Sequence, residues 1–130
     1  MGHINECPIR VYIEDTDAGG IVFYANYLRF MERGRTEWLR DIGYQQGKLL
    51  AEGIQLVVSR LTCRYLRPAV LDDLLNVVTA VTACQGPRVT LSQRVMKGDI
   101  CLCDGEVDIV CIDADTQRPM RVPHCVKKAF

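Results

Sequence analysis

The chain of 130 residues lacks several sequence features that by themselves identify a class of protein. It has only two histidines, His3 and His124, near opposite ends, and none of its seven cysteines is spaced C-x-x-C. A zinc or other metal site is therefore not expected. The odd number of cysteines argues against a disulfide framework, and the thiols are interpreted as free, small apolar side chains. If the C-x-C pair Cys101 and Cys103 lies in a strand, both side chains should share one face.

Net charge and long apolar runs are also missing. Sixteen basic residues balance sixteen acidic ones, so no net charge attracts nucleic acid. The most apolar run, residues 74–84, includes Asn76, Thr79 and Thr82 and is too short to span a membrane. The first twelve residues lack the apolar core of a signal peptide. The sequence therefore predicts a soluble, cytoplasmic protein with no integral membrane segment, and its length fits one domain over residues 1–130.

One long helix is expected in the first third of the chain. Apolar side chains there recur at spacings of three, four and seven, which predicts a helix over residues 26–42. Gly43 is expected to end this helix, and Gly34 is expected to let a strand approach it closely. A shorter helix is expected at about residues 45–52. The apolar stripe of the long helix consists of Tyr24, Tyr27, Leu28, Met31, Trp38 and Ile42.

The other segments have the composition of strands. Residues 8–14 alternate, which predicts a strand with Ile9, Val11 and Ile13 on one face. Further strands are expected at residues 55–66, 74–84, 88–96 and 100–113, and short turns join the last three into an antiparallel meander. The tail, residues 119–130, contains two prolines and has no clear period.

This order of elements predicts an α+β fold in which an antiparallel sheet of about five strands curls around one long central helix. The edges of such a sheet need protection, which indicates an oligomer.

The stretch YIEDTDAGGIVFYANYLRFMERGR, residues 12–35, carries more turn-forming residues than one turn needs. In most proteins Asp15, Asp17, Gly19 and Gly20 would be turn and capping residues. As a site, a carboxylate beside the free amides of a helix N-terminus supplies a nucleophile or base together with an oxyanion donor. Glycines also let a substrate approach the backbone closely.

This stretch is the main part of a resemblance that covers nearly the whole chain. The chain resembles the hotdog-fold acyl-CoA thioesterases of the 4-hydroxybenzoyl-CoA thioesterase family, and within it the YbgC-like branch associated with the Tol–Pal system. The resemblance implies hydrolysis of an acyl-CoA without a cofactor, by a homodimer that often pairs into a homotetramer. Its active sites would lie at the subunit boundary, near the N-terminus of each central helix. The resemblance is carried by Tyr12, Asp15, Thr16, Asp17, Gly19, Gly20, Val22, Tyr24, Tyr27, Glu32 and Arg35, by VVSRLTCRYLRPAVLDD at residues 57–73, and by SQRV at residues 92–95.

The resemblance also implies roles for single residues. Asp17 would be the catalytic carboxylate, acting either as nucleophile or as general base, while Asp15 would hold the turn. A backbone amide at or near Tyr24 would bind the oxyanion. Many YbgC-like sequences have histidine where this chain has Tyr24. Substrate contacts are expected from Gly19, Gly20 and Val22. Independently of the resemblance, Arg64, Arg67 and Arg88 are candidates to bind the phosphates of coenzyme A, although arginines at strand ends are usually solvated. Arg88, which follows a Gly-Pro turn, is the one expected to do so.

The sequence leaves two other functions to compare with thioester hydrolysis. A hotdog dehydratase or hydratase uses a histidine with a carboxylate, and neither histidine of this chain lies near the motif. A non-catalytic acyl-binding or scaffold module, associated with the Tol–Pal system of the cell envelope, remains as the alternative to the enzyme. The preferred acyl chain cannot be read from the sequence.

Overall fold

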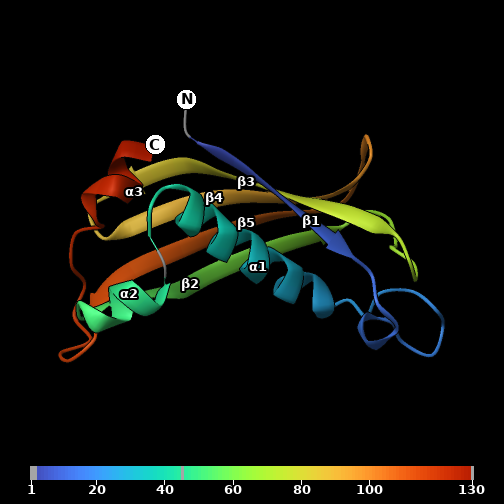
Figure 1. The fold of residues 1–130 in the computed structure, drawn as a ribbon, viewed down its shortest axis with the longest axis horizontal. Coiled ribbons are helices and arrows are strands. Elements are labelled where there is room, and N and C mark those ends of the chain that lie inside the picture. The colour runs from blue at the N-terminus through green and yellow to red at the C-terminus, as the bar shows by residue number, and fades with distance from the viewer. Residues whose placement is uncertain (1–2, 45, 130) are drawn as a thin grey trace.

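The computed structural model describes residues 3–44 and 46–129, which form one antiparallel sheet and three helices (Figure 1). The elements in chain order are β1 (Ile4–Arg10), a 3₁₀ turn (Ile13–Asp15), α1 (Asn26–Asp41), α2 (Gln46–Ala51), β2 (Ile54–Tyr65), β3 (Leu74–Gln85), β4 (Arg88–Lys97), β5 (Ile100–Asp113) and α3 (His124–Ala129).

The sheet has the strand order β1-β3-β4-β5-β2, and every neighbouring pair is antiparallel. Short turns connect β3, β4 and β5, so the predicted meander is confirmed. The two strands that flank the helical segment, β1 and β2, form the two edges. The predicted α+β class with a five-stranded sheet and one long helix is therefore confirmed.

Helix α1 lies across one face of the curved sheet (Figure 1) and approaches it most closely at Gly34. A Cβ atom at this position would lie 2.6 Å from Cγ1 of Val77 and 3.1 Å from the side-chain nitrogen of Gln93. Any larger residue would push the helix away from β3 and β4. The expected close approach of a strand at Gly34 is confirmed.

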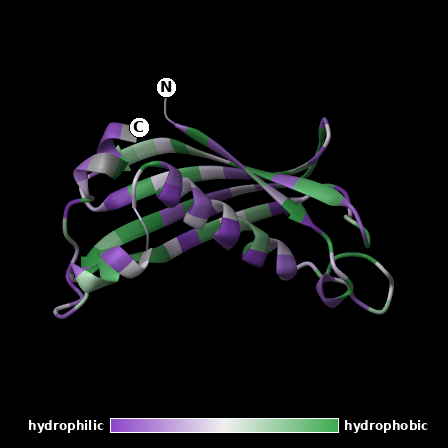
Figure 2. Ribbon diagram, viewed as in Figure 1, coloured by the Kyte–Doolittle hydropathy of each residue, from purple (hydrophilic) through white to green (hydrophobic). Residues whose placement is uncertain are grey.

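The core divides into two parts along α1. The first packs around Tyr27, Phe30 and Met31, and the second around Trp38 and Leu39. The side of α1 turned to the viewer in Figure 2 carries mostly hydrophilic residues, whereas the strands behind it alternate between the two kinds. This is the pattern of a helix with one buried stripe on a sheet with one buried face.

The first strand is shifted relative to the prediction for residues 8–14. β1 ends at Arg10, and the chain turns at Ile13–Asp15. Ile9 and Val11 are buried as expected, but Ile13 is 75% exposed, so the expectation for Ile13 was wrong. The cause is local, because the carboxylate of Asp15 accepts the backbone N–H of Tyr12 and bends the chain.

The predicted stripe of α1 was partly wrong. Tyr27, Met31 and Trp38 are buried, while Tyr24 and Leu28 are largely exposed. Phe30 and Leu39, which the stripe did not include, are buried instead. The sheet covers more of the helix than one narrow stripe, and the side that carries Tyr24 and Leu28 lies open.

Two further features of the structure were not predicted from the sequence. The tail forms α3, whose Val126 packs into the core with Val122.

The second feature is a bulge in β5. Cys101 pairs with Met96 but Cys103 pairs with Val95, so the strand has an extra residue at Leu102. The bulge places Leu102 and Cys103 in the core and turns Cys101 to the other face, which contradicts the expected shared face.

The helices in the part of the chain that the structure describes include none that is both long and apolar enough to cross a membrane.

Candidate active site

The loop between β1 and α1 is held by Asp15, which is buried at 7% exposure. Its Oδ2 accepts the backbone N–H of Tyr12 at 2.8 Å, and its Oδ1 accepts the side-chain amide of Asn26 at 2.7 Å. Its backbone carbonyl accepts the N–H of Phe23 at 3.0 Å. Asp15 thus ties the turn to the first residue of α1, and both of its carboxylate oxygens are occupied.

Asp17 has a different environment, although it is only two residues away. Its side chain is exposed, and its Oδ1 accepts the backbone N–H of Gly19 at 2.8 Å. The turn is closed by Gly20, which donates its N–H to the carbonyl of Asp17 and has a φ of +81°, a conformation that favours glycine. Within the described residues Oδ2 of Asp17 accepts no hydrogen bond. One oxygen is therefore fixed by the turn and the other is free to react.

The carboxylate of Asp17 lines a pocket of about 380 Å³ together with the start of α1. The pocket is lined by Glu14, Thr16, Asp17, Phe23, Ala25, Asn26 and Arg29. No side chain caps the N-terminus of α1, and in the described part of the chain the N–H groups of Tyr24 and Ala25 have no acceptor. Free amides at this end carry the positive pole of a helix dipole. Asp17 and Ala25, whose N–H is a potential oxyanion donor, therefore line one pocket.

The side chain of Tyr24 does not enter this pocket. It lines a separate, apolar pocket of about 220 Å³, where its ring meets that of Tyr65 edge-to-face with the centroids 6.3 Å apart. Tyr27 also packs against Tyr65 and accepts the backbone N–H of Ala69 with its hydroxyl group. Burial raises the pKa values of both Tyr27 and Tyr65, so both phenols are neutral at physiological pH. Tyr24 itself does not line the pocket of Asp17, which its chain neighbours Phe23 and Ala25 do line.

The remaining predicted residues lie at different places. Gly19 and Gly20 form the Asp17 turn, and a Cβ at Gly19 would lie 3.2 Å from Oδ1 of Asp17. Val22 is buried and forms part of the wall of the apolar pocket. Arg88 begins β4 at the end of the sheet opposite to the Asp17 turn, so one protomer does not bring Arg88 and Asp17 together.

Sequence reasoning missed two groups that contribute to the site. Asn26 anchors Asp15, and Tyr65 completes the apolar pocket from the end of β2. Tyr65 is far from the motif in sequence, and only the folded sheet brings it beside Tyr24.

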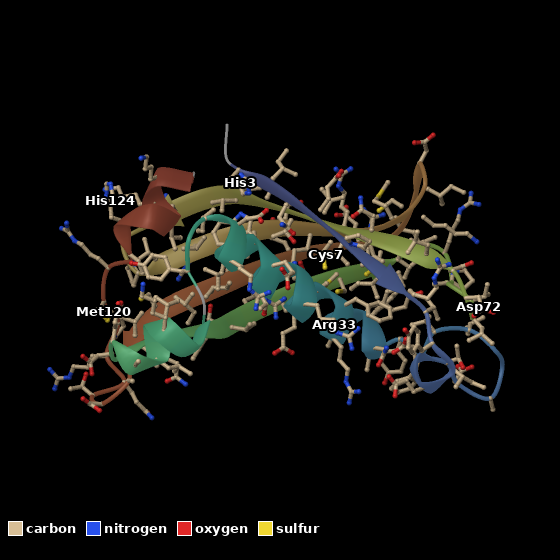
Figure 3. All side chains as sticks on the ribbon, viewed as in Figure 1. His3, Cys7, Arg33, Asp72, Met120 and His124 are labelled. Atoms are coloured by element: carbon tan, nitrogen blue, oxygen red, sulfur yellow. The ribbon has the colours of Figure 1, made fainter. Side chains whose placement is uncertain are left out.

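Other chemistries find little support near this loop. His124, labelled in Figure 3, lies at the opposite end of the molecule from it, and His3 contacts Asp41 at the C-terminal end of α1. Over residues 3–44 and 46–129 there is no group of three or more His, Cys, Asp or Glu side chains arranged to hold a metal ion. The cysteines described there are free, and burial raises the pKa values of Cys63 and Cys103. These two thiols are therefore protonated core side chains and not nucleophiles.

Comparison with known proteins agrees with the observed fold and identifies the family of the chain. The model of the thioesterase-like superfamily matches residues 11–130. The chain is 44% identical to the acyl-CoA thioesterase YbgC of Haemophilus influenzae over 124 residues, covering 95% of this chain and 91% of that protein. It is 40% identical to the acyl-CoA thioester hydrolase YbgC of Escherichia coli O6:H1, covering 95% and 92%. The crystal structure of a probable thioesterase from Bartonella henselae superposes with a TM-score of 0.87 at 36% identity, covering 93% of this chain and all of that one.

Proposed function

Because this chain belongs to the thioesterase-like superfamily, we propose that it hydrolyses the thioester bond of an acyl-CoA and releases the free acid and coenzyme A. The observation that carries this proposal is the pocket at the start of α1. There the unpaired oxygen of Asp17 shares one space with the uncapped end of a helix.

Asp17 supplies the reactive carboxylate in this proposal. As nucleophile, its free oxygen attacks the thioester carbon, coenzyme A leaves as the thiolate, and water then hydrolyses the acyl anhydride on Asp17. As general base, it takes a proton from water, which attacks the same carbon directly. Both routes pass through a tetrahedral oxyanion, and in this proposal a backbone N–H at or near Tyr24 donates to it. The hydrogen bond from Gly19 fixes the carboxylate for either route.

Gly19, Gly20 and Val22 are the substrate contacts in this proposal. The absence of side chains at the two glycines leaves the backbone of the Asp17 turn open to the thioester. Val22 contributes an apolar contact from the wall of the separate apolar pocket.

We further propose that the working form is a homodimer, or a homotetramer built from it. β2 pairs with β5 on one side only, and its 12 residues leave a long free edge with Val58 and Tyr65 exposed. If two copies of β2 pair antiparallel about a twofold axis, each protomer is reversed end to end relative to its partner. The Arg88 end of one protomer then lies at the same end of the dimer as the partner's Asp17. Such an arrangement would let Arg88 bind the phosphates of a coenzyme A whose thioester lies in the other subunit.

The test is the release of free thiol from a panel of acyl-CoA esters by the wild-type protein and by Asp17→Asn. The wild type should hydrolyse at least one ester, and Asp17→Asn should lose about 100-fold or more of the turnover, since a positioned acid–base group contributes roughly 10²–10⁴-fold. Coenzyme A should still bind to the variant. A protein that binds acyl-CoA but releases no thiol would be the non-catalytic acyl-binding or scaffold module, as expected of a Tol–Pal accessory protein, and would overturn the enzyme assignment.

A further inference from the structure

A third pocket lies between α1, α2 and β2, on the open side of α1. Its volume is about 250 Å³, below the size range of roughly 300–1,000 Å³ that is typical for sites of drug-sized ligands. The walls are mainly aliphatic, and the polar side chains are those of Glu32, Arg35 and Gln55. The aliphatic lining consists of Leu39, Leu49, Leu50, Ile54, Leu56, Val58 and Ile109.

Arg35 is the unusual member of this pocket. Its side chain is half-buried, and its Nη1 donates one hydrogen bond of 2.9 Å to the side-chain oxygen of Gln93. The amide nitrogen of Gln93 donates in turn to the carbonyl of Met31 and to the hydroxyl of Thr79, so Gln93 holds Arg35 from a fully buried, fully bonded position. Within the described residues Arg35 forms no ion pair, and its other N–H groups are unused.

An arginine in this position is costly for the folded protein. Burial lowers the pKa of Arg35, and among the residues that the structure describes the compensating charge is that of Glu32, which is exposed at the rim of the pocket. Taking a guanidinium partly out of water without a partner destabilises the fold unless a ligand supplies the partner. A carboxylate is the group whose geometry matches the fork of N–H donors that remains.

We propose that this pocket receives the acyl group of the substrate and that Arg35 binds a carboxylate at the far end of a short acyl chain. The inference rests on the proposed thioesterase function and names its substrate class: the coenzyme A monothioester of a short dicarboxylic acid. The aliphatic walls pack against the methylene groups of the chain, and the small volume excludes a long one. A neutral acyl chain of the same length leaves Arg35 unpaired and binds less well.

In the dimer proposed above, this pocket belongs to the site of the partner subunit. Arg35 lies about 14 Å along α1 from Asn26, too far for a short acyl group attached beside the Asp17 of the same chain. Antiparallel pairing of two β2 strands puts Ile54 and Leu56, at one end of the strand, beside Tyr65 at the other end of the partner strand. Tyr65 of each chain contacts Tyr24 at the start of α1. The pocket of one protomer therefore opens toward the catalytic end of the other.

The first experiment compares two substrates of similar length, glutaryl-CoA and hexanoyl-CoA. The wild type should have the higher kcat/KM for glutaryl-CoA. Arg35→Met, which keeps an unbranched apolar stem but removes the guanidinium and its charge, should lower kcat/KM for glutaryl-CoA about 10- to 100-fold, the value of one or two charge-assisted hydrogen bonds. It should leave hexanoyl-CoA unchanged or improved, and Arg35→Lys should recover part of the loss. Arg33→Met, on the exposed side of the same helix, is the matched control and should change neither substrate.

Equal losses on both substrates in Arg35→Met would assign Arg35 a purely structural role and overturn the proposal. So would a wild-type preference for hexanoyl-CoA. Absence of hydrolysis with every ester would instead refute the thioesterase function itself, so the two failures are distinguishable.

The second experiment tests whether the site is shared. Asp17→Asn and Arg35→Met chains are unfolded together, refolded and assayed on glutaryl-CoA. A mixed dimer contains one site with Asp17 from one chain and Arg35 from the other, so the mixture should recover activity well above that of either variant alone. No recovery, with mixed dimers demonstrated by a tag on one chain, would place both groups in the same protomer or remove Arg35 from the site.

Discussion

The two ends of α1 are completed in opposite ways. At the C-terminal end three of the last four carbonyls are bonded: Trp38 accepts the N–H of Ile42, Leu39 that of Tyr44, and Arg40 that of Gly43. At the N-terminal end no side chain caps the helix, and Asp17 stands exposed in front of it. The closed end contributes stability through packing and hydrogen bonds. The open end keeps polar groups available for a ligand, as binding and catalytic sites require.

The largest effect on stability is expected at the closed end. Trp38 is 2% exposed, packs in the second core cluster and donates its indole N–H to the carbonyl of His3. Trp38→Ala should lower the free energy of unfolding by about 3–5 kcal/mol, which urea unfolding would measure. The folded fraction should retain turnover within about twofold of the wild type at low temperature, since Trp38 is far from the pocket of Asp17. A loss of turnover as large as that of Asp17→Asn, in protein shown to be folded, would break the distinction between the two ends.

An intermediate effect is expected from Asp15, the buried carboxylate of the open end. Asp15→Asn replaces one acceptor oxygen by an NH₂ group that faces the N–H of either Tyr12 or Asn26. One buried hydrogen bond is lost, and the free energy of unfolding should fall by about 1–3 kcal/mol in the same urea titration. Unchanged stability would show that Asp15 does not hold the loop.

The smallest effect concerns the loss of stability at low pH. Hydrogen bonds from Asn5 and His3 lower the pKa of Asp41 at the closed end. A carboxyl whose pKa is lowered by folding stabilises the protein above its unfolded pKa of about 3.9, and this contribution is lost as the pH falls through the folded pKa. Asp41→Asn should therefore lose less stability than the wild type between pH 5 and pH 2, measured by thermal unfolding. Parallel curves for the two proteins would remove Asp41 from this role.

Much of the fold could be predicted from the sequence, because helices and strands follow periodic patterns of apolar residues. The strand at residues 100–113 has the predicted bounds, and α1 ends one residue earlier than predicted. The errors arose where side chains or packing override the pattern. Asp15 bends the end of the first strand, and α3 has only six residues, so its helix depends on the burial of Val126 and not on a period.

Only part of the candidate site could be predicted from the sequence. Asp17 and its glycines could be located, because turn residues before a helix form a local motif. The apolar pocket depends on Tyr65 meeting Tyr24, and the position of Arg35 depends on Gln93, 58 residues away in sequence. Such contacts are created by the register of the sheet, and a single sequence does not contain them in readable form.

The central claim is that Asp17 carries the chemistry of the open end while Asp15 carries its structure. The most direct test measures turnover of the best acyl-CoA substrate and the free energy of unfolding, side by side, for Asp17→Asn and Asp15→Asn. Asn at position 17 keeps an oxygen for the N–H of Gly19, so Asp17→Asn should unfold within about 0.5 kcal/mol of the wild type and lose about 100-fold or more in turnover. Asp15→Asn should show the reverse, with reduced stability and far smaller loss of turnover. Near-normal turnover in Asp17→Asn, or equal losses of turnover in the two variants, would contradict the account.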